Sequence, residues 1–205
     1  WGRPATELPA FIIKRVPFRF IFDNNYFNDA YQGIPKGGYN VLIDALLEGI
    51  EVRLDTNYFE NREAWDAMAD KILFTGCIDE FFNLEYRSLR FDHRHLEVED
   101  YQGNAVVNYT AGDVPYTRVI EHKHFEYGTQ PTTVITYEYP DTFAPGKEPY
   151  YPVNDVRNSE IFKSYRELAV SRENVLFGGR LAQYTYADMD DTVAAALALA
   201  KQQFC

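Results

Sequence analysis

Residues 175–192 place a glycine turn between a short apolar run and the start of an alanine-rich helix. Gly178 and Gly179 let the backbone approach a ligand closely, and Arg180 is a fixed cation whose planar guanidinium suits a diphosphate. The helix predicted after Asp188 directs free N–H groups at whatever precedes it. This order of residues indicates one half of a nucleotide-cofactor site.

The other half of such a site, a G-x-G-x-x-G turn directly after a strand, is absent from the sequence. Flavin and nicotinamide folds normally carry this turn near their beginning. The chain also opens on Trp1 rather than on a methionine, without an apolar signal segment or a basic leader. We therefore expect the chain to be a fragment of a longer protein.

A second set of candidates consists of aromatic and arginine side chains on predicted strands and loops. Aromatic rings can stack a base, tyrosine hydroxyls can hold phosphate oxygens, and arginines can offset a diphosphate charge bidentately. The set comprises Trp1, Arg15, Tyr26, Arg118, Tyr150, Tyr151 and Tyr186. Most of the 16 tyrosines must be ordinary sheet packing, and both arginines have the alternative of pairing with surface carboxylates. These residue types suit the binding of a sugar nucleotide. For each residue, ordinary packing or surface pairing is the alternative.

The histidines offer a metal site as a further alternative. His93, His95, His122 and His124 have the two-residue spacing that puts each pair on one face of a strand. Acidic residues around them indicate a solvated face, and no closing cysteine or supporting ligand motif appears. We predict no metal site.

Composition narrows the class of protein. The 205 residues are 46% hydrophobic and 16% aromatic, which is typical of a compact globular chain. The net charge of −11 argues against general nucleic-acid binding. The only cysteines, Cys77 and Cys205, provide no disulfide framework, and no apolar run is long enough to span a membrane. Together with the absent leader, this predicts a cytoplasmic protein.

The periodicity predicts a mixed α/β (α+β) fold whose middle differs from its two ends. The ends alternate strands and helices, whereas residues 84–140 consist of period-two runs separated by glycine turns. The predicted strands are 12–22, 50–54, 71–76, 85–92, 95–100, 105–110, 116–125, 132–138 and 175–177. The predicted helices are 39–47, 158–170 and the one after residue 188, with 61–70 helical or loop-like.

Several motifs occur in an order that resembles the UDP-galactopyranose mutase family over practically the whole chain. These motifs are residues 15–19, 31–39, 84–91, 102–109, 115–123, 148–155 and 178–190. The resemblance implies a bacterial-type flavoenzyme that interconverts UDP-galactopyranose and UDP-galactofuranose without net redox change. This chain would be its C-terminal portion.

The resemblance also assigns parts of the chain to the domains of the family's fold. Residues 1–83 would hold a substrate-binding loop and part of the FAD domain, a Rossmann-like fold. Residues 84–140 would form the antiparallel β-sheet of the substrate domain. Residues 141–205 would return to the FAD domain with the C-terminal helix. The chain departs from the family between Phe82 and Leu84, where the family usually has several more residues.

Residue roles follow from the same resemblance. Arg15 and Arg118 resemble the two catalytic arginines that grip the diphosphate. The substrate-binding residues would be these two with Trp1, Tyr26, Asn108, Tyr151 and Tyr186. The FAD-binding residues would be Asn57, Tyr58, Arg180, Ala187, Asp188, Met189, Asp190, Asp191 and Thr192, with much of the FAD site outside this chain.

In the reaction that the family implies, reduced flavin attacks the anomeric carbon of galactose through its N5 atom and expels UDP. The sugar then opens and recloses as a five-membered ring. The resemblance further implies a homodimer, without a nucleic-acid or membrane partner, and an isolated fragment that is inactive. A non-catalytic nucleotide-sugar-binding module is the alternative, and a different FAD oxidoreductase is disfavoured by the motifs of the middle region.

Overall fold

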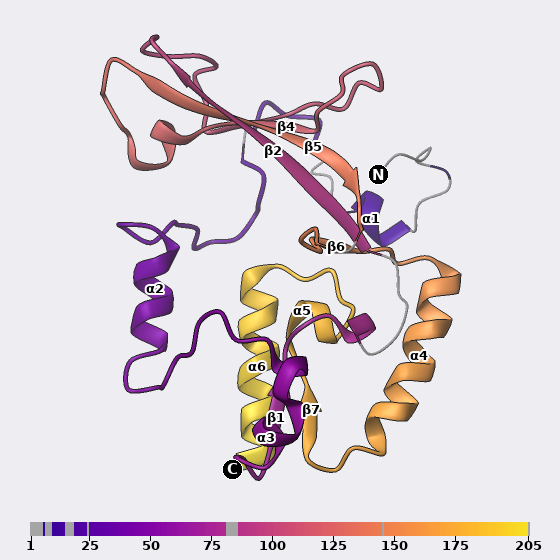
Figure 1. Cartoon of the computed structure of the whole chain (residues 1–205). Coiled ribbons are helices and arrows are strands. Elements are labelled where there is room, and N and C mark those ends of the chain that lie inside the picture. Colours follow the sequence, from indigo (N-terminus) through magenta and orange to yellow (C-terminus); the bar gives the residue numbers. More distant parts are fainter. Residues whose placement is uncertain are drawn as a thin grey trace. The chain divides into compact units, whose positions relative to one another are not determined.

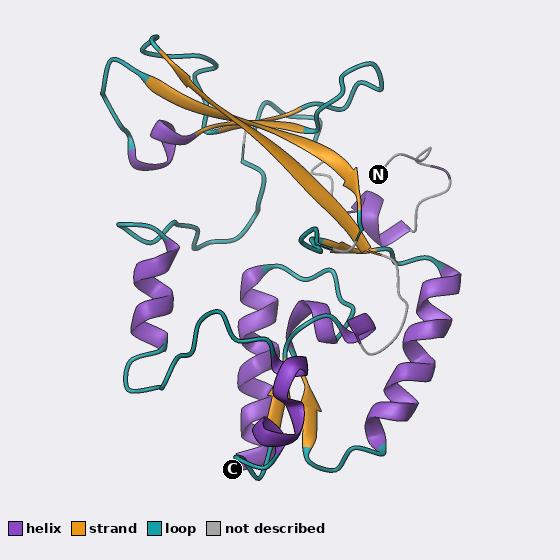
Figure 2. Cartoon of the chain, viewed as in Figure 1, coloured by secondary structure: helices purple, strands orange, loops and turns teal. Residues whose placement is uncertain are grey.

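The computed structural model describes residues 6, 10–14, 19–23, 25–80, 86–144 and 146–204, and no side chain is described at positions 11, 86 and 87. The chain divides into two compact units, which are treated separately below (Figures 1 and 2). Unit 1 comprises Trp1–Thr56 and Arg90–Pro140, and unit 2 comprises Asn57–Leu89 and Asp141–Cys205. No helix within the described ranges has both the length and the apolarity needed to cross a bilayer.

Unit 1 is built on antiparallel strands. β3 (Val106–Asn108) pairs with β4 (Arg118–Glu121), which pairs in turn with β5 (Thr133–Thr142). β2 (Tyr86–Leu96) follows β5 in the sheet order β3-β4-β5-β2-β6. Unit 1 also contains α1 (Ala10–Lys14), α2 (Tyr39–Leu46) and the 3-10 turn η4 (His122–Glu126).

Strand alternation separates the two faces of this sheet. Val119, Ile135 and Tyr137 are buried together on one face and form the core of the unit. The residues between them along β4 and β5 point to the opposite face, where Arg118 lies directly across from Glu138. Arg118 and Glu138 therefore lie on the face opposite to the core, whereas the buried carboxylate of Glu121 is on the same face as Val119.

Unit 2 combines a small parallel sheet with helices. β1 (Ile72–Phe74) pairs in parallel with β7 (Val175–Phe177), and the start of β2 pairs antiparallel with β6 (Tyr151–Pro152). The helices of the unit are η2 (Tyr58–Asn61), α3 (Arg62–Asp66), η3 (Ile78–Glu80), α4 (Val156–Val170), α5 (Gly179–Ala182) and α6 (Met189–Phe204).

The core of unit 2 forms around the strand that precedes the glycine turn. Phe74, Val175 and Ala182 are buried in one cluster, and Phe177 packs against this cluster as well as against a second one. Tyr184 anchors the second cluster, where its hydroxyl bonds the backbone of Val153. These contacts fix the positions of β7, α5 and the loop after α5.

The predicted class, mixed α/β with an antiparallel middle, is confirmed. The predicted helices at 39–47 and 158–170 are confirmed as α2 and α4. α4 begins two residues earlier than predicted because the Asp155 side chain accepts the backbone N–H of Asn158 and caps the helix. The strand at 71–76 is confirmed as β1, in which Leu73 is 52% exposed.

Five predicted strands are corrected. Within 12–22, residues 12–14 belong to helix α1, and residues 19–22 adopt no regular structure; a short apolar run without clear periodicity does not distinguish helix from strand. Residues 50–54 do not pair with another described strand. The runs 85–92 and 95–100 are one strand, β2, that ends at Leu96. The run 116–125 leaves the sheet after Glu121 and continues as η4.

Candidate functional site

Arg118, one of the two arginines predicted to bind the diphosphate, lies between an amide and a carboxylate on three neighbouring strands of unit 1. Asn108 on β3 and Glu138 on β5 are the direct cross-strand partners of Arg118 on β4. Arg118 donates from Nε to Asn108 Oδ1 at 3.0 Å, and its Nη1 lies 3.6 Å from Glu138 Oε2. The guanidinium is thus held from both sides while 38% of the side chain stays exposed. Such a group can still donate to an anion that approaches this face.

Glu138 was not identified from the sequence, although its carboxylate forms an ion pair with Arg118. Its side chain is 10% exposed, and its Oε1 also accepts the Thr117 hydroxyl at 3.0 Å. A buried carboxylate requires such donors because water no longer solvates it. The period-two pattern placed 132–138 on a strand, but it carried no information on the register that sets Glu138 opposite Arg118.

Three further residues of unit 1 were predicted to bind the substrate: Tyr26, Trp1 and Arg15. Tyr26 is half-exposed in a loop and contacts the ring of Phe27 edge-on at 4.9 Å. Trp1 and Arg15 lie outside the described residues. Their roles remain predictions from the sequence.

In unit 2, Arg180 lies against two of the predicted tyrosines. Its Cζ is 5.7 Å from the ring centroid of Tyr151 and 5.7 Å from that of Tyr186. The two rings are 5.2 Å apart, and Arg180 donates from Nη2 to the backbone carbonyl of Tyr150 at 3.1 Å. The structure therefore gathers four of the residues singled out in the sequence, from β6 and the residue before it, α5 and the loop before α6.

The glycine turn that carries Arg180 is shaped by packing. A Cβ on Gly178 would lie 2.9 Å from Leu73 Cδ1 and 3.3 Å from Leu199 Cδ2. Gly179 has φ of +78°, a conformation that side chains rarely adopt. Gly178 is thus required for close contact of β7 with β1 and α6, and Gly179 for the sharp entry into α5.

The start of α6 is acidic, as the sequence predicted. The Asp188 carbonyl accepts both the N–H of Thr192 at 3.0 Å and its hydroxyl at 2.8 Å. Asp190 and Asp191 occupy the first turn and Ala187 precedes it, partly buried. The carboxylates offset the partial positive charge of the helix N-terminus. A phosphate group would be repelled by these carboxylates, so the helix N-terminus suits a weakly charged ring edge better than a diphosphate.

Asn57 and Tyr58 take part in local packing. Asn57 caps η2 by accepting the N–H of Phe59 at 2.9 Å, and the Tyr58 ring packs against Phe74. Burial, followed by the hydrogen bond to Asp66, raises the pKa of the Tyr58 hydroxyl above its usual value. The hydroxyl is thus neutral at physiological pH, and a role at the adenosine side remains a prediction.

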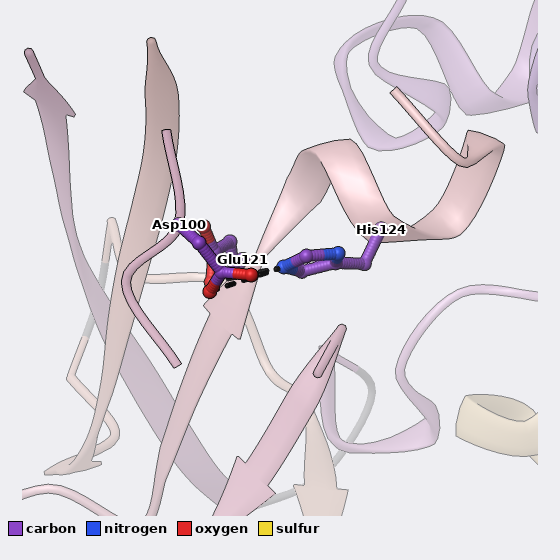
Figure 3. Close-up of side chains that lie close together, drawn as sticks. All are labelled: Asp100, Glu121 and His124. Carbon is purple, nitrogen blue, oxygen red and sulfur yellow. Dashed lines mark ion pairs between the residues drawn. The ribbon is translucent and has the colours of Figure 1, made fainter. Parts of the chain in front are cut away.

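A carboxylate and histidine cluster lies elsewhere in unit 1 (Figure 3). Asp100, Glu121 and His124 have side-chain ligand atoms within 4.8 Å of one another. The Glu121 carboxylate accepts the backbone N–H groups of Tyr101 and Gln102 at 3.0 and 2.9 Å. Thr133 donates its hydroxyl at 2.8 Å, and His124 Nε2 lies 3.1 Å away.

These contacts make Glu121 an anchor for the chain that enters β3. Burial by itself raises the pKa of the Glu121 carboxyl, but the hydrogen bonds from Gln102, Thr133 and Tyr101 outweigh it and lower the pKa. The carboxylate is fully buried, and a metal ion would have to displace these donors. The cluster is therefore better suited to stabilising a loop than to binding a metal.

The residues around Arg180 fit a nucleotide cofactor in one specific respect. Nε of Arg180 is buried, and no described group accepts its hydrogen. A buried donor without an acceptor is costly, and a phosphate oxygen is the acceptor that a guanidinium binds most strongly. The position of Arg180 directly after the glycine turn agrees with the cofactor half-site predicted from residues 175–192.

Comparison with known proteins identifies the family. The family model for UDP-galactopyranose mutase matches residues 1–186. A Klebsiella pneumoniae protein named "Probable UDP-galactopyranose mutase" is 39% identical, over 98% of this chain and 54% of the relative. A dTDP-fucopyranose mutase from Escherichia coli is 36% identical, over 98% of this chain and 56% of the relative. A UDP-galactopyranose mutase from Mycoplasma pneumoniae is 32% identical, over 98% of this chain and 56% of the relative.

The chain spans about half the length of the curated relatives it matches. The matched part contains Arg118 with its cross-strand neighbours in unit 1, and Arg180 with its tyrosine neighbours in unit 2. Since the family model covers most of the sequence, the chain belongs to the UDP-galactopyranose mutase family.

Proposed function

We propose that this chain provides substrate-binding and flavin-binding residues of a mutase that interconverts UDP-galactopyranose and UDP-galactofuranose. Support comes from the family match and from the two relatives named for this activity. The observation that carries the proposal is the orientation of Arg118 between Asn108 and Glu138, with part of its side chain open to an anion.

Arg118, together with Arg15, is proposed to bind the diphosphate of the substrate. Charge grows on the diphosphate as the bond to the anomeric carbon breaks, so a fixed guanidinium binds the transition state more tightly than the ground state. Asn108 supports this by accepting from Nε, which leaves the two terminal nitrogens outside this bond. Trp1 is proposed for the uridine, and Tyr26, Tyr151 and Tyr186 for phosphate oxygens.

Residues of unit 2 are proposed to hold the cofactor, FAD. When bound in its reduced form, this group supplies the nucleophilic nitrogen that the reaction needs. Arg180 provides a buried donor for a phosphate or ring oxygen. Residues 187–192, at the N-terminus of α6, are proposed to face the negative ring edge of the reduced cofactor, and Asn57 and Tyr58 are proposed for its adenosine side.

The experiment is carried out on the protein that contains this chain. It has two readouts, flavin absorption and conversion of the sugar nucleotide. We expect a flavin absorption spectrum, and we expect UDP-galactofuranose to be converted to UDP-galactopyranose only after reduction with dithionite. A flavin spectrum without conversion would assign a different flavoenzyme. UDP binding without flavin would assign the non-catalytic sugar-nucleotide module.

A second candidate substrate is favoured by one relative. The dTDP-fucopyranose mutase from E. coli is nearly as similar to this chain as the mutase from K. pneumoniae. Fucose lacks the 6-hydroxyl of galactose, and thymine carries a methyl group that uracil lacks. Parallel assays with UDP-galactofuranose and dTDP-fucofuranose distinguish the two, because a site that hydrogen-bonds the 6-hydroxyl rejects the sugar without it.

The remaining assignments belong to the same proposal. Residues 1–83 are assigned to the substrate-binding loop and part of the FAD domain, 84–140 to the substrate sheet, and 141–205 to the return into the FAD domain. The active protein is proposed to be a cytoplasmic homodimer that acts on sugar nucleotides and not on nucleic acids or membranes. The 205-residue chain alone is proposed to be inactive, which an assay of this chain with added FAD and dithionite tests directly.

A further inference from the structure

A bulky residue in the loop between α5 and α6 has an unusual backbone conformation. Tyr184 has φ of +48°, in the left-handed region that residues other than glycine rarely adopt. For an aromatic residue this conformation persists only where the surrounding structure fixes it, and such residues are found preferentially at functional sites. The course of this loop therefore depends on the contacts that the Tyr184 side chain makes.

The side chain of Tyr184 is held at its ring and at its hydroxyl. The ring stacks on that of Phe162 in α4, with centroids 5.7 Å apart and planes inclined at 30°, and Tyr184 is 5% exposed. The hydroxyl accepts the backbone N–H of Val153 at 3.0 Å and donates to the carbonyl of the same residue at 3.1 Å. Both the donor and the acceptor function of the hydroxyl are thus used on a residue that is 31 positions away in the chain.

These two hydrogen bonds connect the segments that carry two of the predicted phosphate-binding tyrosines. Tyr151 lies two residues before Val153, and Tyr186 lies two residues after Tyr184. The rings of Tyr151 and Tyr186 are 5.2 Å apart, and Arg180 Cζ lies 5.7 Å from each ring centroid. The link between Tyr184 and Val153 therefore determines how these two segments lie relative to each other.

Neither of the two segments is part of a long helix or strand. Tyr151 belongs to β6, which has only two residues and pairs with the start of β2 over that length. A strand this short has little stability of its own. Tyr186 lies in the loop between α5 and α6. Arg180 adds one further bond between the segments, from Nη2 to the carbonyl of Tyr150 at 3.1 Å. The positions of the two tyrosines thus depend on side-chain contacts such as those of Tyr184.

The separation of the two tyrosines matters because of the role proposed for them. Both are proposed to bind oxygens of one diphosphate, so their hydroxyls have to match the separation of those oxygens. Binding groups that are held loosely lose affinity, because the ligand then has to immobilise them at an entropic cost. A residue that fixes both tyrosines would therefore increase substrate affinity without contacting the substrate.

We propose that Tyr184 is a positioning residue for substrate binding, because its bonds to Val153 hold Tyr151 and Tyr186 at the separation that one diphosphate requires. The inference rests on the function proposed above and assigns a role in it to a buried residue outside the ligand contacts. An ordinary core tyrosine is the alternative, and it would affect stability but not substrate affinity.

The test is steady-state kinetics of the protein that contains this chain, with reduced flavin and UDP-galactofuranose. Tyr184→Phe retains the ring and its packing but removes both hydrogen bonds to Val153. We expect KM to rise about fivefold or more and kcat to change by less than about twofold, because binding of the diphosphate is weakened while the reacting centre is untouched. Tyr165→Phe, which removes a hydroxyl on α4 beside the same core cluster, is the matched control and should leave KM unchanged.

A multiple-mutant comparison separates positioning from a general loosening of the fold. In a Tyr151→Phe/Tyr186→Phe background, which lacks both phosphate-binding hydroxyls, Tyr184→Phe should raise KM little further, because residues that act through one another are not additive. Thr185→Gly is a second variant that leaves the core unchanged, since residue 185 is exposed. Glycine adds backbone freedom between Tyr184 and Tyr186, so KM should rise here too, by about threefold.

Circular dichroism checks that each variant is folded, and Thr185→Gly decides by itself where Tyr184→Phe does not fold. The proposal is wrong if the deciding variant leaves KM unchanged, if Tyr165→Phe raises KM equally, or if Tyr184→Phe has its full effect in the background without the two hydroxyls. Failure of the proposed function gives a different result, because the unchanged protein would then convert no UDP-galactofuranose. Failure of this inference alone leaves that conversion intact.

Discussion

Arg118 on β4 donates from Nε to Asn108, its direct cross-strand neighbour on β3, at 3.0 Å. Glu138 lies on the other side of the same guanidinium, 3.6 Å from Nη1. Since one neighbour is neutral and the other is an anion, the two affect the guanidinium differently. Asn108 orients it, whereas Glu138 both orients it and competes with any anionic ligand.

This difference leads to opposite predictions for two variants. Arg118→Ala should weaken UDP binding by about tenfold or more, as expected for loss of a charge-assisted hydrogen bond worth about 1.5–3 kcal/mol. Glu138→Gln keeps a polar neighbour but removes the competing charge, so UDP should bind at least as tightly as to the unchanged chain. Isothermal titration calorimetry measures both. Weaker binding by Glu138→Gln, or unchanged binding by Arg118→Ala, would contradict the assignment of this face to the diphosphate.

We predict that a positive charge alone at position 180 is not sufficient to bind the flavin. Arg180→Lys retains the cation but loses the planar fork that contacts both tyrosine rings and the Tyr150 carbonyl. We expect Arg180→Lys and Arg180→Ala both to lower flavin affinity at least tenfold, measured from bound flavin absorbance after dialysis. Arg172→Ala, which removes an exposed arginine just before β7, is the matched control and should retain flavin. Full retention by Arg180→Lys would show that only the charge matters.

The glycine turn yields a stability prediction that is independent of ligand. Gly178 has φ of −140°, which any residue adopts, so Gly178→Ala acts only through the clash with Leu73 and Leu199. Overpacking of this kind costs about 1–3 kcal/mol. Since about 1 kcal/mol shifts the melting temperature of a chain of this size by about 2–4 °C, the decrease should be measurable by calorimetry. Gly112→Ala, where an added Cβ meets nothing within 4 Å, should change it little. Equal effects of the two variants would contradict the packing explanation.

The sequence predicted local structure well where one signal dominated. The period of α4 and the turn at Gly178 each depend on residues close together in the chain, whereas the cap at Asp155 was not predicted. Residues 12–14 show the limit, because the same β-branched run suits a helix or a strand and only the surrounding packing decides.

The candidate site shows the same limit. The sequence identified Arg118 and Arg180 as candidate residues, but not what contacts them. Glu138 lies beside Arg118 because of the register between β4 and β5. Arg180 contacts Tyr151 and Tyr186, which are 29 and 6 residues away from it in the chain. Such long-range relationships cannot be derived from local periodicity.

A buried carboxyl predicts a pH-dependent stability in unit 2. Burial, followed by repulsion from Glu80, raises the pKa of Asp79 from 3.8 to about 6. The folded state therefore binds this proton more tightly than the unfolded state does, so the contribution of Asp79 is fully present below pH 4 and is lost as pH rises through about 6. We expect the melting temperature of Asp79→Asn to increase relative to that of the unchanged chain as pH rises from 4 to 7. Asp113→Asn in an exposed turn is the control for loss of a carboxylate, and a constant difference for Asp79→Asn would exclude the burial effect.

The same environment should make Cys77 unreactive. Burial first, and then the neighbouring charges of Asp79 and Glu80, raise the pKa of its thiol to about 12. Only the thiolate attacks disulfide reagents, and Cys77 is 7% exposed, so neither ionisation nor access favours reaction. In a Cys205→Ser variant, which leaves Cys77 as the only thiol, Ellman's reagent at pH 8 should react only after guanidinium unfolds the chain. Asp79→Asn should speed the reaction little, because burial remains. Rapid reaction of the folded variant would mean that the cluster around Cys77 and Tyr184 opens readily in solution, and it would weaken the stability argument for Asp79 as well.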